Sequence, residues 1–333
     1  MECDKAEARC IRTGNIRIRF SGHRAIISKE RMVSLLTIQP TAKIYKMSRD
    51  NVPAAYAKSG DTVRFETLDC FGCQIRREDQ PLGSLDGNNI NPATGPLFIK
   101  GAVPGDVLKV EILEIELDDH GVMVHKPGKG AAGSAAAEKT IKILPVKNGM
   151  VLFNEKLAFP IDPMIGVIGT APAGEGIDTG TPGAHGGNMD CTRIGAGAAL
   201  YLPVNVEGAL LALGDLHARM GDGEVDVCGV EIAGAVTVRV SVVKNCGLPT
   251  PFLVNGEIAA AIFSAQTVDE ACAGATTAMH TFLMTELGMN EHEAGMLLSV
   301  AGDLCICQIV DPEMTCRMEI PVSVADAYQY TFA

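Results

Sequence analysis

The sequence predicts an α+β fold in which strands dominate, and three observations support this prediction. Short runs rich in β-branched residues alternate apolar and charged side chains. Glycine accounts for 36 of 333 residues without a collagen-like period, which indicates many tight turns and close backbone approaches. Clear helix signals occur only near the C-terminal end. Many strands and few helices together favour a mainly β architecture.

Three segments carry the strand pattern most clearly. Apolar residues alternate with charged or polar residues over most of each segment, as expected for a half-buried strand. The segments are residues 62–68 (TVRFETL), 106–117 (DVLKVEILEIEL) and 236–243 (VTVRVSVV). Gly-Asp and Pro-Gly turn dipeptides precede the first two. A further strand is predicted at 303–311 (DLCICQIVD), after the helices.

Two helices are predicted in the C-terminal part of the chain. Thr267 and Glu270 have the spacing of a capping box, and the helix that they open is expected to run to about Glu286 and to stop at Gly288. Asn290 starts a second, shorter helix through the MLLSV segment.

The chain is predicted to consist of an N-terminal extension, residues 1–40, and one larger domain, residues 41–333. Residues 1–40 follow no clear helix or strand pattern. The small, flexible residues at 127–139 mark a loop and a possible internal division. A second Gly/Pro-rich segment, 170–190, lies between two apolar stretches, so an ordered and buried functional loop is expected there.

Charge and composition exclude several classes of protein. The net charge of −12 argues against binding to nucleic acid or to an anionic membrane surface. No apolar stretch approaches the roughly 20 residues of a membrane helix, and the N-terminus lacks a signal-peptide pattern, so a cytoplasmic location is expected. The eleven cysteines are expected to be reduced thiols, and the Cys70–Cys73 CxxC motif is interpreted as structural.

Polar side chains with ligand or acid–base capacity concentrate between residues 185 and 231. Asp215 and His217 are two apart in a strand-like segment, so their side chains should leave the same face. Glu231 lies in apolar text, where a carboxylate is costly unless it is paired or ligated. The other candidates are His185, Asp190, Asp222 and Glu224, with Asp69 further upstream. Mixed His and carboxylate donors suit zinc or a related divalent ion.

Several of these residues have a structural alternative. Asp222 is expected to cap a turn, and Asp215 could cap the glycine turn before it. His217, flanked by apolar residues, could be a hydrogen-bonded core histidine. Cys191 is a rival nucleophile directly after Asp190, although the sequence establishes no Cys–His pair.

Five blocks in the same order resemble the acetamidase/formamidase family. They include SGDTVRFETLDCFGCQI, PMIGVIGTAPAGEGIDTGTPGAHGGNMD, YLPVNVEGALLALGDLHARMGDGE and VCGVEIAG, and the resemblance runs from about residue 41 to residue 330. It implies a mainly β fold of sandwich or barrel units with a small α/β portion, assembled as a homodimer or higher homo-oligomer. It also implies a hydrolase that cleaves the C–N bond of short linear amides such as formamide and acetamide.

The resemblance also implies site residues and a cofactor. Asp69, His185, Asp190, His217, Glu224 and Glu231 match the family's polar motifs. We assign Asp190, Glu224 and His185 to catalysis, and Asp69, Asp215, His217 and Glu231 to a divalent metal, zinc first and calcium second. The backbone of Gly186, Gly187 and Asn188 is assigned to the substrate oxyanion.

Two other functions remain open from the sequence. One is a catalytically idle relative that binds a metal or a small molecule, suggested by Ala235, where relatives often carry an acid. The other is hydrolysis of a cyclic amide at the same site, because pocket shape decides specificity.

Overall fold

The computed structural model describes residues 35–133 and 138–333. Leu35–Ala333 form one compact unit. The extension predicted at residues 1–40 falls mostly on residues 1–34, outside the described residues. Its boundary, and the possible internal division near residues 127–139, stay predictions.

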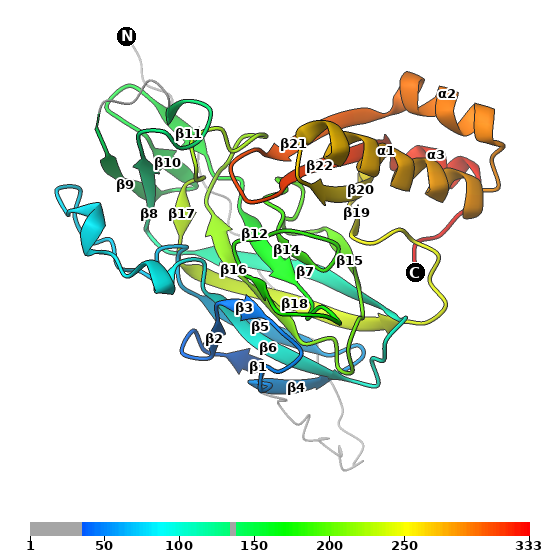
Figure 1. Cartoon of the computed structure of the whole chain (residues 1–333), viewed down its shortest axis with the longest axis horizontal. Helices are drawn as coiled ribbons and strands as arrows, with labels where there is room; N and C mark the ends of the chain where they lie inside the picture. The colour runs from blue at the N-terminus through cyan, green and yellow to red at the C-terminus, as the bar shows by residue number, and fades with distance from the viewer. Residues whose placement is uncertain (1–34, 134–137) are drawn as a thin grey trace, which may run out of the picture. The chain divides into compact units, whose positions relative to one another are not determined.

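The first large sheet contains nine strands in the order β1-β5-β18-β7-β15-β19-β20-β22-β21 (Figure 1). The strands predicted at 62–68, 106–117 and 236–243 are β5, β7 and β18, and they lie side by side. β21 begins at Asp303 as predicted but ends at Gln308 instead of residue 311. The bounds are β1 Leu36–Ile38, β5 Thr62–Thr67, β18 Gly234–Val243, β7 Val107–Leu117, β15 Ala199–Pro203, β19 Phe252–Val254, β20 Ile258–Ala265, β22 Met314–Pro321 and β21 Asp303–Gln308.

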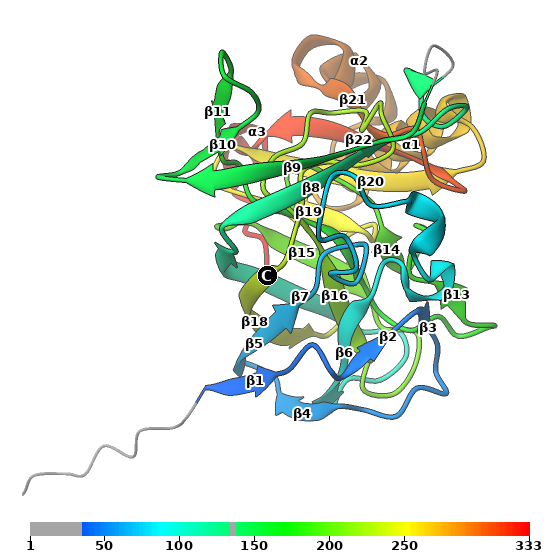
Figure 2. The same ribbon diagram turned by 90° about the vertical axis from the view of Figure 1, so that its left-hand side faces the viewer.

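The second large sheet contains eleven strands. Eight follow the order β11-β10-β9-β8-β17-β16-β12-β14, while β6 pairs with β16 and also with β2 and β4. Figure 2 shows β8, β9 and the β10–β11 hairpin as one extended arm of this sheet. The bounds are β11 Ala158–Pro160, β10 Met150–Leu152, β9 Thr140–Lys147, β8 His120–His125, β17 Glu231–Ile232, β16 Leu211–His217, β12 Met164–Gly169, β14 Gly186–Asn188, β6 Ala93–Lys100, β2 Lys43–Ile44 and β4 Ala55–Lys58. β13 (Ile177–Asp178) and β3 (Lys46–Met47) form a separate pair.

The helices α1 (Val268–Thr285), α2 (Glu291–Ala301) and α3 (Val322–Ala327) all belong to the C-terminal part of the chain. Thr267 caps α1 by accepting from the N–H of Glu270, and Asn290 caps α2 in the same way, so both predicted helices are confirmed. α1 packs on β20 and β22. No local sequence pattern predicted α3.

Buried apolar side chains from both large sheets form the main core. Phe65 of β5 and Val238 of β18 belong to this core together with Ile165 of β12 and Leu213 of β16. A second core lies between α1, α2 and the β19–β22 strands. In it the ring of Phe282 contacts the rings of Phe252 and Tyr330. The prediction of a mainly β fold with a small helical portion is confirmed.

Within the described residues, no helix has the length and apolar character to cross a membrane. The cysteines of residues 35–133 and 138–333 are all free thiols.

Candidate active site

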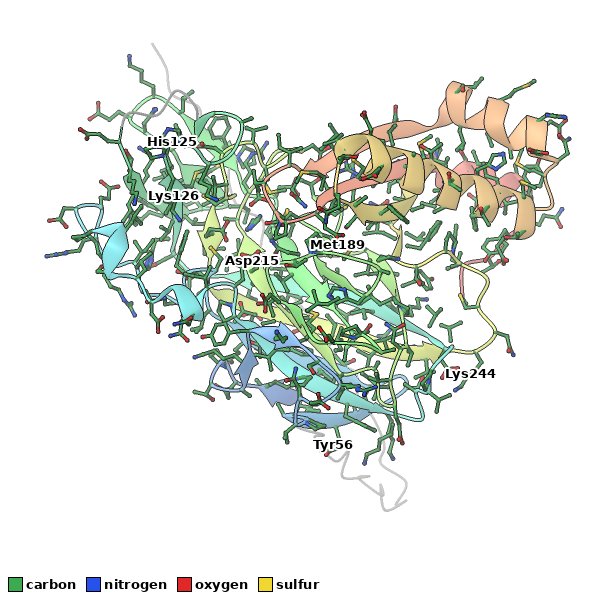
Figure 3. The ribbon with its side chains drawn as sticks, in the orientation of Figure 1. Tyr56, His125, Lys126, Met189, Asp215 and Lys244 are labelled. Atoms are coloured by element: carbon green, nitrogen blue, oxygen red, sulfur yellow. The ribbon has the colours of Figure 1, made fainter. Side chains whose placement is uncertain are left out.

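The candidate site lies in the middle of the eleven-stranded sheet, where β17, β16, β12 and β14 are neighbours. β17 supplies Glu231, and β16 supplies Asp215 and His217. Asp190 follows the end of β14, and Glu224 lies in the turn region after β16. We call these five residues the donor cluster. Figure 3 labels Asp215 among the central strands, whereas Tyr56 and Lys244 lie at the periphery.

The donor cluster converges on the ring of His217. Its Nε2 atom lies 3.0 Å from Glu231 Oε1, 3.7 Å from Asp215 Oδ1 and 3.9 Å from Asp190 Oδ1. One potential ligand atom each from Asp190, His217 and Glu224 lies within 4.8 Å of the others. The same holds for Cys70, Asp215 and Glu231. Residues that span about 160 positions of the sequence are therefore within reach of a shared ion.

Three of the acids have a left-handed backbone, which non-glycine residues rarely adopt. The φ angles are 44° at Asp190, 56° at Asp215 and 42° at Glu224. In the β12–β16 ladder, Ile165 pairs with Leu216 and Val167 pairs with Gly214, while the position of Asp215 between them is left out. Asp215 and His217 do meet, but the strand alternation used in the sequence analysis is interrupted at Asp215. Such conformations cost of order 1–3 kcal/mol each and cluster at functional sites.

Gly166 of β12 leaves the space in which two of the carboxylates meet. A Cβ atom at this position would lie 2.5 Å from Asp190 Oδ1 and 2.6 Å from Asp215 Oδ2. It would also lie 2.8 Å from the backbone oxygen of Asp215, which cannot move aside as a side chain could. The acids can therefore adopt this arrangement only because residue 166 is a glycine.

We expect Gly166→Ala to disrupt the donor cluster while the sheet persists. The new methyl group would displace the carboxylates of Asp190 and Asp215, so bound metal and activity should both fall at least tenfold. Metal content and far-UV circular dichroism of the purified variant measure the two effects. Gly174→Ala is the matched control, since a Cβ there meets nothing within 4 Å. A Gly166→Ala protein with normal metal content would contradict this account.

Many polar atoms of the cluster are buried without a hydrogen-bond partner. Among the described residues they include both carboxylate oxygens of Asp190, Oδ1 of Asp215, Nδ1 of His217, Oε2 of Glu224 and Oε2 of Glu231. Nε2 of His217 lies 3.0 Å from Glu231 Oε1 but without the geometry of a hydrogen bond. Buried polar atoms are normally satisfied, and those that are not call for an explanation such as an ion or water. A donor set this rich in unpaired nitrogen and oxygen atoms fits a divalent cation.

The charges point the same way. Burial raises the pKa of Asp190 and of Glu224 well above the ordinary value, and neighbouring carboxylates add to the shift. Burial also raises the pKa of Glu231 to about 8. Burial lowers the pKa of His217, but Glu231 and Asp215 outweigh it and raise that pKa well above the ordinary value. Four acids around one histidine need protons or a cation to balance them.

Asp69 was expected to bind a metal and Cys70 to be structural, but their contacts suit the opposite roles. The Asp69 carboxylate accepts the N–H of Cys73 at 2.7 Å and so stabilises the turn after β5. In both possible ligand groups found among the described residues Asp69 is absent, while the sulfur of Cys70 lies with Asp215 and Glu231. The metal role of Asp69 stays a prediction, and Cys70 is a candidate that the structural interpretation of the CxxC motif missed.

Asp311 is a second residue that the sequence analysis missed. It follows β21 and accepts a hydrogen bond from the side-chain amide of Asn188 at 2.7 Å. Burial raises its pKa to about 7, and it is close enough to Asp190 to raise the pKa of that residue. Its distance from the rest of the site in the sequence left no local signal by which to find it.

The residues predicted to form an oxyanion loop lie in a strand instead, and His185 before them is buried. Gly186, Gly187 and Asn188 form β14 and pair with β12, and the N–H of Gly186 donates to the oxygen of Gly183. His185 is buried, and burial alone lowers its pKa to about 4, so it is neutral near pH 7. The catalytic and oxyanion roles given to these residues stay predictions.

Asp222 and Cys191 lie beside the cluster. Asp222 accepts two hydrogen bonds from Arg317, at 2.9 and 2.7 Å, and one from Thr192 at 2.7 Å, so its contacts are with distant side chains rather than with the turn that it was expected to cap. Cys191 is fully buried next to Cys307, whose thiol lowers the Cys191 pKa. Its role as a rival nucleophile is untested.

A pocket of about 330 Å³ opens beside the donor cluster. Glu224 lines it and belongs to the cluster as well. Gly229 also lines it and lies against the ring of His217, because a Cβ there would come within 2.7 Å of Nδ1. We call this cavity the Glu224 pocket. It joins the buried donors to a space that a small molecule can enter.

Comparisons with known proteins agree on one family. The family model described as Acetamidase/Formamidase family matches residues 39–179 and 173–327. The crystal structure of an acetamidase from Bacillus halodurans has a TM-score of 0.87 and 49% identity, covering 88% of this chain and 99% of that one. A predicted acetamidase/formamidase from Thermoanaerobacter tengcongensis has a TM-score of 0.87 and 45% identity, covering 89% and 99%.

The curated relatives are longer than the region that they share with this chain. A formamidase from Methylophilus methylotrophus is 29% identical over 57% of this chain and 61% of its own length. The chain spans about 60% of the length of the curated relatives that it matches. The family model and the solved structures nevertheless cover most of the chain, and the chain belongs to the acetamidase/formamidase family.

Proposed function

We propose that this protein hydrolyses the C–N bond of small primary amides to a carboxylate and ammonia. The observation that carries the proposal is the position of Glu224, which lines a pocket and also belongs to the buried donor cluster. A substrate in the pocket would therefore meet an acid–base group and the proposed ion ligands at once. Relatives named acetamidase and formamidase support the same reaction.

We assign Asp190, Asp215, His217 and Glu231 to a divalent ion, because the three acids surround Nε2 of His217 within 3.9 Å. Zinc is the first choice for mixed histidine and carboxylate donors, and calcium is the alternative for an oxygen-rich set. Zinc, when bound, would lower the pKa of water to roughly 7 and polarise a carbonyl group.

The protein's own residues supply the proton transfers. Amide hydrolysis needs a group that accepts a proton from the attacking water and one that returns a proton to the departing nitrogen. Glu224 is the acid of the cluster that lines the pocket, so its carboxylate can perform both transfers in turn. Asp190 is fully buried and does not line the Glu224 pocket, and it is therefore placed with the ion rather than with the substrate.

His217→Ala tests the ion site. The variant removes the nitrogen on which the acids converge, so we expect it to lose its bound metal and to release no ammonia from amides. Elemental analysis of protein purified without a histidine tag measures the first effect, and an ammonia assay before and after chelation measures the second. His292→Ala, at an exposed position of α2, is the matched control. Unchanged metal content in His217→Ala would remove His217 from the site.

The same assay separates the alternatives. Tight metal binding without turnover of formamide, acetamide or longer amides would identify an idle relative, and turnover of a lactam alone would identify a cyclic amide hydrolase. Ala235 gives the idle alternative no support. This residue of β18 pairs with Glu66 of β5 and Glu116 of β7. Among the described residues it neither lines the Glu224 pocket nor belongs to a possible ligand group. We further propose that the protein is cytoplasmic and forms a homodimer or higher homo-oligomer. Light scattering would test the oligomeric state.

A further inference from the structure

The Glu224 pocket is larger than the smallest amides require. At roughly 30 Å³ for each non-hydrogen atom, the share of one water molecule in the liquid, the four such atoms of acetamide fill about 120 Å³ at most. The pocket holds about 330 Å³. More than half of it would stay empty behind acetamide, and that space adjoins the group proposed to transfer protons.

Hydrocarbon forms most of the pocket wall. β8 and the β10–β11 region supply part of it, and the segment after β16 supplies the rest. The apolar side chains are Met123, Phe153, Phe159, Met220, Val225 and Val230. The rings of Phe153 and Phe159 meet edge to face with their centroids 6.3 Å apart. A wall of this kind stabilises an apolar group by removing its surface from water.

The charged residues of the wall are already engaged, with Glu224 as the exception. Asp222 is held by two hydrogen bonds from Arg317, and Asp226 lies 2.7 Å from the ring Nδ1 of His125. Arg219 donates to the oxygen of Pro160 at 2.8 Å, and its guanidinium lies 5.7 Å from the ring centre of Phe159. Glu224 keeps Oε2 buried without a partner. Most of the wall is thus hydrocarbon, and its charged groups other than Glu224 already have protein partners.

We infer that the Glu224 pocket is an acyl-binding site, and that the preferred substrates are uncharged primary amides with an apolar acyl group of several carbons or a ring. This inference rests on the proposed amide hydrolysis and specifies its substrate class. The acyl chain lies against the apolar wall while the amide carbon lies next to Glu224. Water adds to that carbon, the C–N bond breaks, and the nitrogen leaves with the proton that Glu224 returns, so that amide and water give carboxylate and ammonium.

The test measures kcat/KM for acetamide, butanamide, hexanamide and phenylacetamide, together with the charged amide succinamate. We expect a rise of about fourfold for each added methylene, the factor that corresponds to about 0.8 kcal/mol of burial, and a poor rate with succinamate. A highest value with formamide or acetamide, or equal rates for succinamate and neutral amides of its size, would overturn the inference.

Val225→Trp narrows the pocket at a position that is 51% exposed, so the fold should tolerate it. We expect the ratio of kcat/KM for hexanamide to that for acetamide to fall at least tenfold. Val300→Trp repeats the substitution at an 85% exposed position of α2 and should leave this ratio unchanged. Phe159→Ala, which removes part of the wall, should lower the ratio about threefold or more. An unchanged ratio in both pocket variants would overturn the inference.

Calorimetric binding distinguishes this inference from the proposed function. If no amide is turned over, the hydrolase proposal fails, and the affinities of hexanamide and acetamide still decide the pocket's preference. Tighter binding of hexanamide, lost in Val225→Trp, would support the acyl-binding site by itself. Absence of hexanamide binding together with absence of turnover would overturn both.

Discussion

Glu224→Gln is expected to lower kcat for amide hydrolysis by about 10²–10⁴-fold while the bound metal stays in place. The amide side chain keeps the volume of the glutamate and can donate a hydrogen bond, but it cannot move a proton between water and the departing nitrogen. Glu224 lines the pocket, whereas Asp190, Asp215, His217 and Glu231 surround one another behind it. Ammonia release and elemental analysis on the same preparation measure the two quantities.

The two readouts assign the role of Glu224. Its ligand atoms also lie within 4.8 Å of those of Asp190 and His217, so a role as a metal ligand is the competing assignment. Loss of both metal and turnover in Glu224→Gln would establish that assignment and contradict ours. A normal kcat would exclude Glu224 from the chemistry altogether. Glu207→Gln, at an exposed position, is the matched control and should change neither quantity.

The elements that follow from local patterns were predictable from the sequence. β5, β7 and β18 show their alternation of apolar and polar residues within six to eleven residues, and the caps of α1 and α2 are set by residues three apart. α3 follows Pro321 with the β-branched residues Val322 and Val324, which have low helix propensity. α3 packs against β22, and such a tertiary contact leaves no local signal in the sequence.

The site was only partly predictable, for physical reasons that particular residues show. Asp190, Asp215 and Glu224 have left-handed backbones that no sequence rule assigns to an aspartate or glutamate, so their side-chain directions could not be derived. Asp69 and Cys70 are neighbours, and spacing alone could not show that the sulfur rather than the carboxylate lies near Asp215. In the sequence Gly166 is one of several residues in an apolar strand, and only the structure shows that it lies against the carboxylates of Asp190 and Asp215.

Asp222 and Arg317 explain how the strained segments of the site are held together. Asp222 is two residues before Glu224, and it accepts a hydrogen bond from Thr192, two residues after Asp190. Arg317 of β22 is 1% exposed and binds Asp222 through both terminal nitrogens. One arginine from the nine-stranded sheet thus fixes the two turns that carry Asp190 and Glu224.

Arg317→Met is expected to lower the free energy of unfolding by about 3 kcal/mol, since breaking a buried, hydrogen-bonded ion pair leaves its partners unsatisfied. The value should lie at the low end of the usual range, because Asp222 is half-exposed and Glu319 keeps its hydrogen bond from Arg193 at 2.9 Å. Arg317→Lys keeps the charge without the forked geometry and should recover only part of the loss. Urea titration measures all three proteins.

Arg64→Met is the comparison that distinguishes the loss of a buried ion pair from the loss of a partly exposed one. Arg64 also binds a carboxylate, that of Glu116, but the pair is partly exposed, and its loss should change the free energy of unfolding by about 1 kcal/mol or less. If Arg317→Met were no more destabilising than Arg64→Met, the Arg317–Asp222 contact would not anchor the turns. If it is destabilising as expected, kcat should fall along with stability, because the backbone conformations of Asp190 and Glu224 depend on the anchor that β22 provides.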